Sequence, residues 1–198
     1  ISISSAARSS PFSIALRSLQ REIIRSDTSW ENGDYDLNGD GPISGMRLAR
    51  KLGMITYRSA KEWSERFGRE RAMEKDLKSG AFGVDFEIES YLESHANKFI
   101  GAFDPNCYLY LSRAMDLFDA SDPDGNLENS FKQLQLEEAL VIGVETDLLF
   151  PISQQTELAR ALEKYVTEVQ LVKLDSLQGH DSFLVDMNRF RPVISSFI

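Results

Sequence analysis

Cysteine and long apolar runs are scarce in these 198 residues, and acidic residues outnumber basic ones. The single cysteine, Cys107, excludes an intrachain disulfide framework and suits a reducing compartment, and we expect it to be a small buried residue. No segment approaches the roughly 18 apolar residues that span a bilayer. With 22 Lys and Arg against 31 Asp and Glu, the net charge of −9 disfavours nucleic acid and anionic lipid as partners. We predict a cytoplasmic protein, or a mitochondrial one if a targeting sequence precedes these residues.

The composition is that of an ordinary globular domain or of part of a larger one, with 42% hydrophobic and 27% charged residues. The first residue is not Met, and Ile1 and Ile3 alternate as though the chain entered in mid-strand. We therefore expect a truncated or processed chain.

The first half of the sequence is mostly helical in pattern. Residues 1–4 predict a short strand and residues 11–25 a helix, with a proline in its first turn. Residues 44–66 have helical periodicity, as do the segments that begin near Phe86 and after the turn at 103–106. The middle of the chain therefore predicts a helical insertion.

The pattern changes after residue 130. Residues 139–144 (ALVIGV) form the continuous apolar run typical of a strand buried on both faces. A helix at 154–165, a strand at 168–174 and a helix from 181 follow. Strand, helix, strand, helix indicates a parallel crossover, so we predict an α/β fold with core segments at 1–41 and 131–198 and a helical lid at 42–130.

Two candidate catalytic residues follow the predicted strands. Asp147 comes just after the first strand, and His180 with Asp181 comes just after the second. Catalytic groups of parallel sheets collect beyond the carboxyl ends of the strands, so an acid and a histidine can meet there. Such a pair orients an imidazole that takes a proton from a nucleophile. The alternative is that Asp147 caps the following helix and His180 is an ordinary loop residue.

The nucleophile of such a triad is missing. No G-x-S-x-G elbow occurs in the sequence, and its serine-rich stretches do not join a strand to a helix. We expect the nucleophile to lie in an N-terminal segment outside these residues.

Several long blocks, in order, resemble the homoserine O-acetyltransferase family of α/β-hydrolase-fold homoserine and serine O-acyltransferases. The blocks are ARSSPFSIALRSLQREII, GMRLARKLGMITYRS, EWSERFGR, KFIGAFDPNCYLYLSRAMDLFD, GVETDLLFPISQQTELARAL and GHDSFLVD. Only the loops near 31–41, 70–84 and 121–135 fall outside the resemblance, which implies the C-terminal part of such a protein.

The resemblance implies ping-pong transfer of an acetyl or succinyl group from acyl-CoA to the side-chain hydroxyl of homoserine or serine, in methionine or cysteine biosynthesis. It implies that Asp147 is the triad acid, His180 the general base and Asp181 the carboxylate that holds the substrate ammonium. Arg50 matches the arginine that binds the substrate carboxylate, and Tyr57 its companion at the mouth of the active site. A surface or lid salt bridge is the alternative for Arg50. No permanently bound cofactor is implied, acetyl-CoA or succinyl-CoA being a co-substrate, and a homodimer is expected.

Three other functions remain open. A cephalosporin-type acetyltransferase would share the blocks, an esterase would use the same triad to pass the acyl group to water, and a fragment without its nucleophile would be non-catalytic. A carboxylate clamp at Arg50 and an ammonium clamp at Asp181 argue against plain hydrolysis, because water needs neither.

Two polar segments are discounted as ligand sites. The loop at 34–45 begins like a calcium loop, but its twelfth position is Gly45 where a bidentate Glu is needed. His95 has no second histidine or cysteine at ligand spacing, so we assign it no metal.

Overall fold

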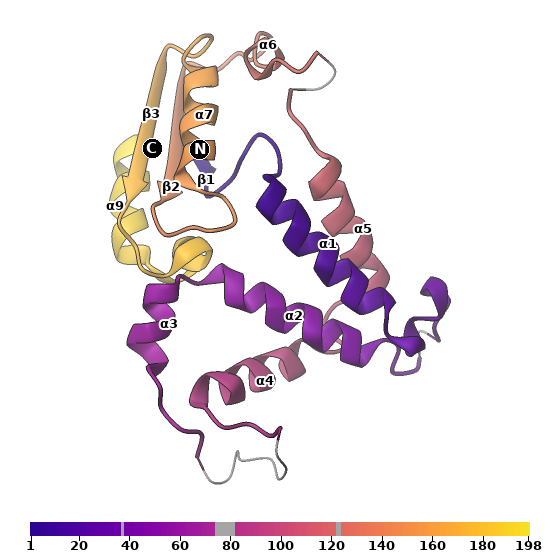
Figure 1. Cartoon of the computed structure of the whole chain (residues 1–198). Coiled ribbons are helices and arrows are strands. Elements are labelled where there is room, and N and C mark those ends of the chain that lie inside the picture. Colours follow the sequence, from indigo (N-terminus) through magenta and orange to yellow (C-terminus); the bar gives the residue numbers. More distant parts are fainter. Residues whose placement is uncertain (37, 74–81, 122–123) are drawn as a thin grey trace. The chain divides into compact units, whose positions relative to one another are not determined.

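The computed structural model describes residues 1–36, 38–73, 82–121 and 124–198. The elements of the first part of the chain are β1 (Ser2–Ile3), α1 (Pro11–Arg25), the 3-10 helix η1 (Thr28–Gly33), α2 (Ile43–Tyr57), α3 (Ala60–Phe67), α4 (Glu87–Phe99) and α5 (Pro105–Leu117). The later elements are α6 (Leu127–Ser130), β2 (Glu138–Val144), α7 (Ile152–Leu162), β3 (Glu168–Leu174), the 3-10 helix η3 (Gly179–Asp181), α8 (Ser182–Val185) and α9 (Met187–Phe197). Figure 1 shows these elements along the chain.

The chain divides into two compact units. Unit 1 comprises residues 1–14, 56–59 and 115–198, and unit 2 comprises residues 15–55 and 60–114. None of the described helices is long and apolar enough to cross a membrane.

Unit 1 is built on a three-stranded parallel sheet in the order β1-β2-β3. β2 lies in the middle, and all of its residues except the first are buried, which explains its unbroken apolar sequence. β2 and β3 pair without interruption from Glu138 opposite Glu168 to Val144 opposite Leu174. The parallel strands, predicted from residues 139–144 and 168–174, are confirmed.

Alternate residues of β2 face opposite layers of unit 1. Ala139 and Val141 pack with Ala159 and Leu162 of α7. The intervening residues, which include Ile142, pack with Phe190 of α9. One helix therefore covers each face of the sheet, as Figure 1 shows with α7 and α9 on either side of β2 and β3. This arrangement leaves the carboxyl ends of the strands for the loops that carry chemistry.

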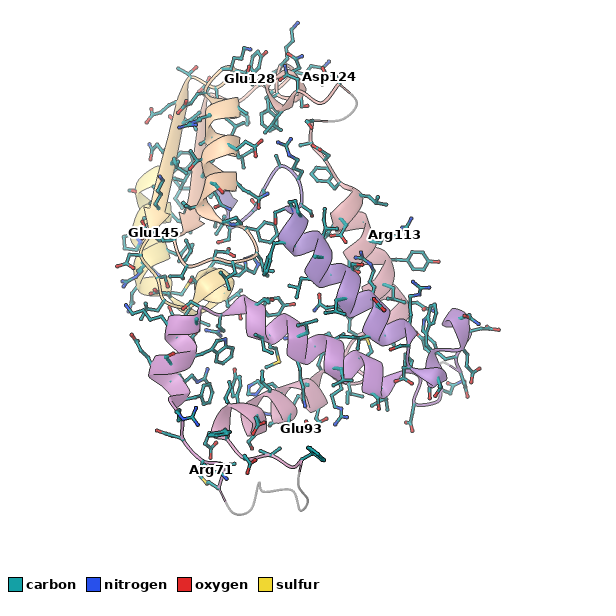
Figure 2. The ribbon with its side chains drawn as sticks, in the orientation of Figure 1. Arg71, Glu93, Arg113, Asp124, Glu128 and Glu145 are labelled. Atoms are coloured by element: carbon teal, nitrogen blue, oxygen red, sulfur yellow. The ribbon has the colours of Figure 1, made fainter. Side chains whose placement is uncertain are left out.

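Unit 2 is helical, with a core of buried Ile24, Met46 and Ala49 from α1 and α2. At Gly45 a Cβ atom would lie 2.9 Å from the Cα of Ile24, so glycine permits the close approach of the two helices. Glu93 of α4, labelled in Figure 2, accepts hydrogen bonds from two side chains of α2, those of Arg47 (2.7 Å) and Lys51.

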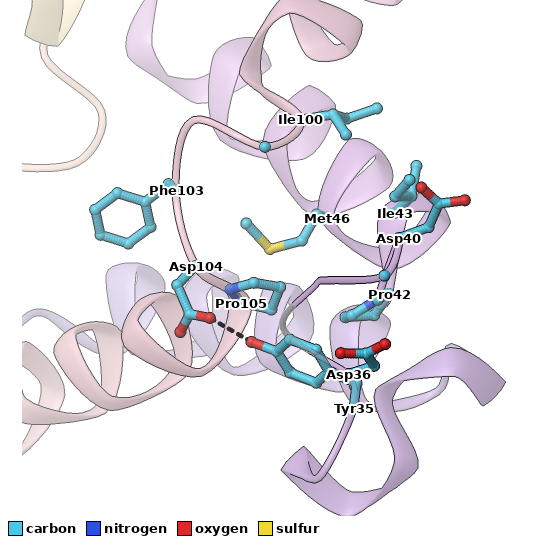
Figure 3. Close-up of a pocket in the computed structure, with 13 residues that line it drawn as sticks. Tyr35, Asp36, Asp40, Pro42, Ile43, Met46, Ile100, Phe103, Asp104 and Pro105 are labelled. Atoms are coloured by element: carbon cyan, nitrogen blue, oxygen red, sulfur yellow. Dashed lines mark hydrogen bonds between the residues drawn. The ribbon is translucent and has the colours of Figure 1, made fainter.

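A cavity of about 240 Å³ lies in unit 2, between the residues drawn in Figure 3. Across it, the Tyr35 hydroxyl donates a hydrogen bond of 2.5 Å to the Asp104 carboxylate. This hydrogen bond holds the pKa of Asp104 below its ordinary value, whereas burial, followed by the same hydrogen bond, raises the pKa of Tyr35. The pair ties the loop before α2 to the start of α5.

Three predictions differ from the observed elements. The helix predicted at 44–66 is two helices, α2 and α3, separated at Arg58 and Ser59. The helix predicted from 181 is interrupted at Asp186. The predicted burial of Cys107 is wrong, because its side chain is exposed in the first turn of α5, where the next residues, Tyr108 and Leu109, pack against the core instead.

Candidate active site

Asp147 and His180 occupy neighbouring loops at the carboxyl ends of β2 and β3. Thr146 joins the two loops, because its hydroxyl donates to the carbonyl of Ser176 (2.6 Å) and accepts from the backbone N–H of Gly179 (3.2 Å). The strands thus bring together an acid and a histidine that are 33 residues apart in sequence.

The Asp147 carboxylate makes a direct contact with the imidazole. Its Oδ2 lies 2.9 Å from Nδ1 of His180, and the Asp147 side chain has no exposed surface. Its Oδ1 accepts from the backbone N–H groups of Leu149 and Phe150, each at 2.9 Å. Helix α7 begins after Pro151 without a side-chain cap, so the alternative in which Asp147 caps this helix is excluded. A carboxylate fixed in this way holds the proton on Nδ1 and leaves Nε2 as a proton acceptor.

Aromatic rings surround the imidazole of His180. The ring centroids of Phe150, Phe183 and Tyr57 lie 5.0, 5.5 and 6.4 Å from that of His180. The His180 side chain is 18% exposed to solvent. The rings restrict the imidazole to one orientation, while its small exposed edge remains accessible to a reacting group.

Asp181 lies beside His180 and forms an ion pair with Arg58. The distance from Arg58 Nε to Asp181 Oδ2 is 3.3 Å. Tyr57, the last residue of α2, lies next to Arg58 in the sequence and contacts the His180 ring. Four of the five predicted site residues, Asp147, His180, Asp181 and Tyr57, therefore lie together in unit 1.

Arg50 belongs to unit 2. It lies in α2, seven residues before Tyr57, and its guanidinium carbon is 4.6 Å from the ring centroid of Phe99. The predicted roles of Arg50, Tyr57 and Asp181 in binding a substrate remain predictions.

Several residues of this site are not among those predicted from the sequence. Arg58 stands in the same TYRS stretch as Tyr57, and Phe150 and Phe183 each stand three residues from a predicted catalytic residue. Proximity in sequence was the only signal for them. No group of three or more His, Cys, Asp or Glu side chains in the described ranges is arranged to hold a metal ion.

A parallel sheet covered by helices on both faces, with a histidine paired to a buried aspartate beyond adjacent strand ends, defines an α/β-hydrolase-fold protein. Solved structures support this class. The homoserine O-acetyltransferase of Bacillus anthracis superposes with a TM-score of 0.85 at 19% identity, over 98% of this chain and 51% of that one. Esterase E22 superposes with a TM-score of 0.80 at 23% identity, over 98% of this chain and 52% of that one.

Curated sequences show a similarity at higher identity. A serine O-succinyltransferase of Xylella fastidiosa strain M12 is 52% identical over 199 aligned residues, which include all of this chain and 54% of the relative. The whole of this chain is therefore similar to about half of a serine O-succinyltransferase, which supports the resemblance to the α/β-hydrolase-fold homoserine and serine O-acyltransferases. The chain spans about half the length of the curated relatives that it matches. No family model matches the sequence.

Proposed function

We propose that the protein containing this chain transfers an acyl group from acyl-CoA to the side-chain hydroxyl of an amino acid, L-serine or L-homoserine. The observation that carries the proposal is the 2.9 Å contact of His180 with buried Asp147, in a chain 52% identical to a serine O-succinyltransferase. The nucleophilic serine belongs to an N-terminal segment outside these residues. No permanently bound cofactor takes part, and acyl-CoA is a co-substrate.

In the first half of the reaction, His180 is the general base. Its Nε2 takes the proton of the serine nucleophile as the serine oxygen attacks the thioester carbonyl. The carbon–sulfur bond breaks, an ester forms on the enzyme, and the proton passes from Nε2 to the departing CoA thiolate. Asp147 keeps the imidazole in the required tautomer and stabilises its cation.

In the second half, the acceptor hydroxyl replaces the serine nucleophile. His180 takes the hydroxyl proton, the acceptor oxygen attacks the enzyme ester, and the serine–acyl bond breaks. The serine oxygen recovers the proton from Nε2, which restores the free enzyme. The two halves form a ping-pong cycle with no net change in protonation.

The acceptor is bound through its charged groups. Asp181, which follows the base in the sequence, takes the ammonium group, and Arg50 takes the carboxylate with a planar bidentate fork. Tyr57, whose ring lies against His180, borders the acceptor. These groups select an amino acid over water.

Among acceptors and donors, we favour L-serine and succinyl-CoA. The name of the Xylella fastidiosa relative supports this choice, whereas the resemblance of the sequence blocks leaves homoserine and serine open as acceptors and acetyl-CoA and succinyl-CoA open as donors. The homodimer expected from the family resemblance is part of the same proposal, and sedimentation velocity tests it.

The test is thiol release by the full-length protein from acetyl-CoA and from succinyl-CoA, with serine, homoserine or no acceptor. We expect acceptor-dependent release that is fastest with serine and succinyl-CoA. His180→Ala should abolish it and Arg50→Ala should raise the KM for the acceptor. His95→Ala is the matched control, because this second histidine is exposed on α4 and bonds the carbonyl of Tyr91 in its own helix.

Two results would overturn the proposal. Release that is equally fast without an acceptor would identify a hydrolase. Release that persists in the His180→Ala variant, or that never occurs in the wild-type protein, would remove the catalytic assignment.

A further inference from the structure

Arg58 follows Tyr57 in the sequence and forms an ion pair with Asp181, so it adjoins two residues of the proposed acceptor site. The side chains of Arg58 and Asp181 are only 16% and 24% exposed. An ion pair shielded from water to this degree is screened less by salt than a surface pair is. Arg58 is therefore placed to control where the Asp181 carboxylate points.

The backbone around Arg58 packs directly against the loop that carries His180 and Asp181. The buried Ser59 hydroxyl donates to the carbonyl of Leu177 in that loop. Gly179, with a φ of +64°, has no space for a side chain, because a Cβ would lie 2.9 Å from Ser59 N and 3.0 Å from the carbonyl carbon of Arg58.

This contact fixes the position of Arg58 in two independent ways. The turn between α2 and α3 cannot move away from the loop without losing the Ser59 hydrogen bond, and the space between the turn and Gly179 is too small even for a Cβ atom. The Arg58 guanidinium therefore extends to Asp181 from a backbone whose position is fixed. A charged side chain that is held rigidly is suited to orienting its partner.

We infer that Arg58 is a positioning residue that fixes the Asp181 carboxylate to receive the ammonium group of the amino-acid acceptor. The inference rests on the proposed function. Arg58 acts through Asp181 and takes no part in transferring the acyl group to the enzyme. Its removal therefore impairs recognition of the ammonium group and leaves the first half of the reaction intact.

The experiment compares two acceptors in the full-length enzyme, L-serine and 3-hydroxypropionate, which lacks the ammonium group. The quantity measured is the ratio of their kcat/KM values. In Arg58→Met, which keeps an unbranched apolar stem without the charge, we expect the preference for serine to fall about tenfold, the size of one lost charge-assisted hydrogen bond. Asp181→Asn should have a similar effect, and the double variant should lose little more, because both changes remove the same interaction.

Two further measurements separate positioning from a structural role. The acceptor-free burst of thiol release should stay within about twofold of wild type in Arg58→Met, because the acylation step does not use Asp181. Arg58→Lys, which retains the charge but loses the planar fork, should recover part of the serine preference. Arg191→Met, which removes an exposed arginine from α9, should change neither quantity.

Each remaining outcome contradicts the inference. An unchanged serine preference in Arg58→Met, or a loss of the burst equal to the loss of turnover, would leave Arg58 a structural residue. A rise in the preference would show that Arg58 opposes the ammonium by its charge. If Arg58→Met does not fold, the same ratio in Arg58→Lys decides. Absence of acceptor-dependent transfer in the wild type would instead refute the proposed function.

Discussion

Replacing Asp147 by asparagine tests the pairing with His180 while almost conserving the shape of the side chain. The carboxylate accepts three hydrogen bonds, two from the backbone N–H groups of Leu149 and Phe150 and one from His180. If the asparagine carbonyl keeps the backbone bonds, its amide group faces Nδ1. Two donors cannot face each other, so the imidazole must carry its proton on Nε2 and cannot act as a base.

The expected loss of activity is therefore much larger than the loss of stability. Acyl transfer should fall by roughly a thousandfold to ten thousandfold, as when the acid of a serine-protease triad is changed to asparagine. The free energy of unfolding should fall by only about 1 kcal/mol, the usual net value of one hydrogen bond. Asp147→Ala should instead destabilise the fold further, because it leaves two backbone N–H groups without an acceptor, at about 1–3 kcal/mol each.

The assay combines turnover, thermal unfolding and nitrogen NMR of the imidazole tautomer in the full-length protein. Asp119→Asn serves as the control, because this carboxylate also accepts a backbone N–H, from Ser121, but lies away from the histidine in the chain. Retention of more than about a tenth of wild-type turnover in Asp147→Asn, or an imidazole that still carries its proton on Nδ1, would refute the reasoning.

Two further predictions concern the fold around the site and the cavity of unit 2. Gly179→Ala should lower the free energy of unfolding, measured by urea denaturation, by more than Gly125→Ala does. Both glycines have positive φ, but of the two only Gly179 also lacks space for a Cβ. An equal loss of stability in the two variants would show that the backbone contact with Arg58 is absent. Tyr35→Phe should lower the melting temperature most between about pH 4 and pH 10. The lowered pKa of Asp104 gives stability that is lost as the pH falls through that pKa, and the raised pKa of Tyr35 gives stability that is lost as the pH rises through that pKa. A difference in melting temperature between wild type and Tyr35→Phe that does not vary with pH would exclude the pair as its cause.

Patterns within one segment were sufficient to predict the elements that frame the site. The buried run at 139–144, the strand at 168–174 and the helix at 11–25 correspond to β2, β3 and α1. Each is set by hydrophobic periodicity, which is a property of neighbouring residues. The meeting of Asp147 and His180 followed from strand order alone, because parallel strands bring their carboxyl ends to one edge.

Contacts between distant residues account for what could not be predicted. Periodicity continues through 44–66, but the helix ends at Tyr57, and the Ser59 hydroxyl bonds Leu177, which is 118 residues away. Nothing in the local sequence specifies that bond. The same holds for Arg58, whose significance depends on Asp181, more than a hundred residues later in the chain.

The hydroxyl of Thr146 has a consequence for which parts of the chain can change length. Residues paired between β2 and β3 differ by 30 in number, and the bond from Thr146 to Ser176 keeps that same offset beyond the last backbone pair. The part of the connection that follows Phe150 and includes α7 can therefore gain or lose residues during evolution without disturbing the acid–histidine distance. By contrast, a single insertion between Leu174 and His180 shifts the histidine relative to its acid, so natural variation in length should concentrate in the former segment and avoid the latter.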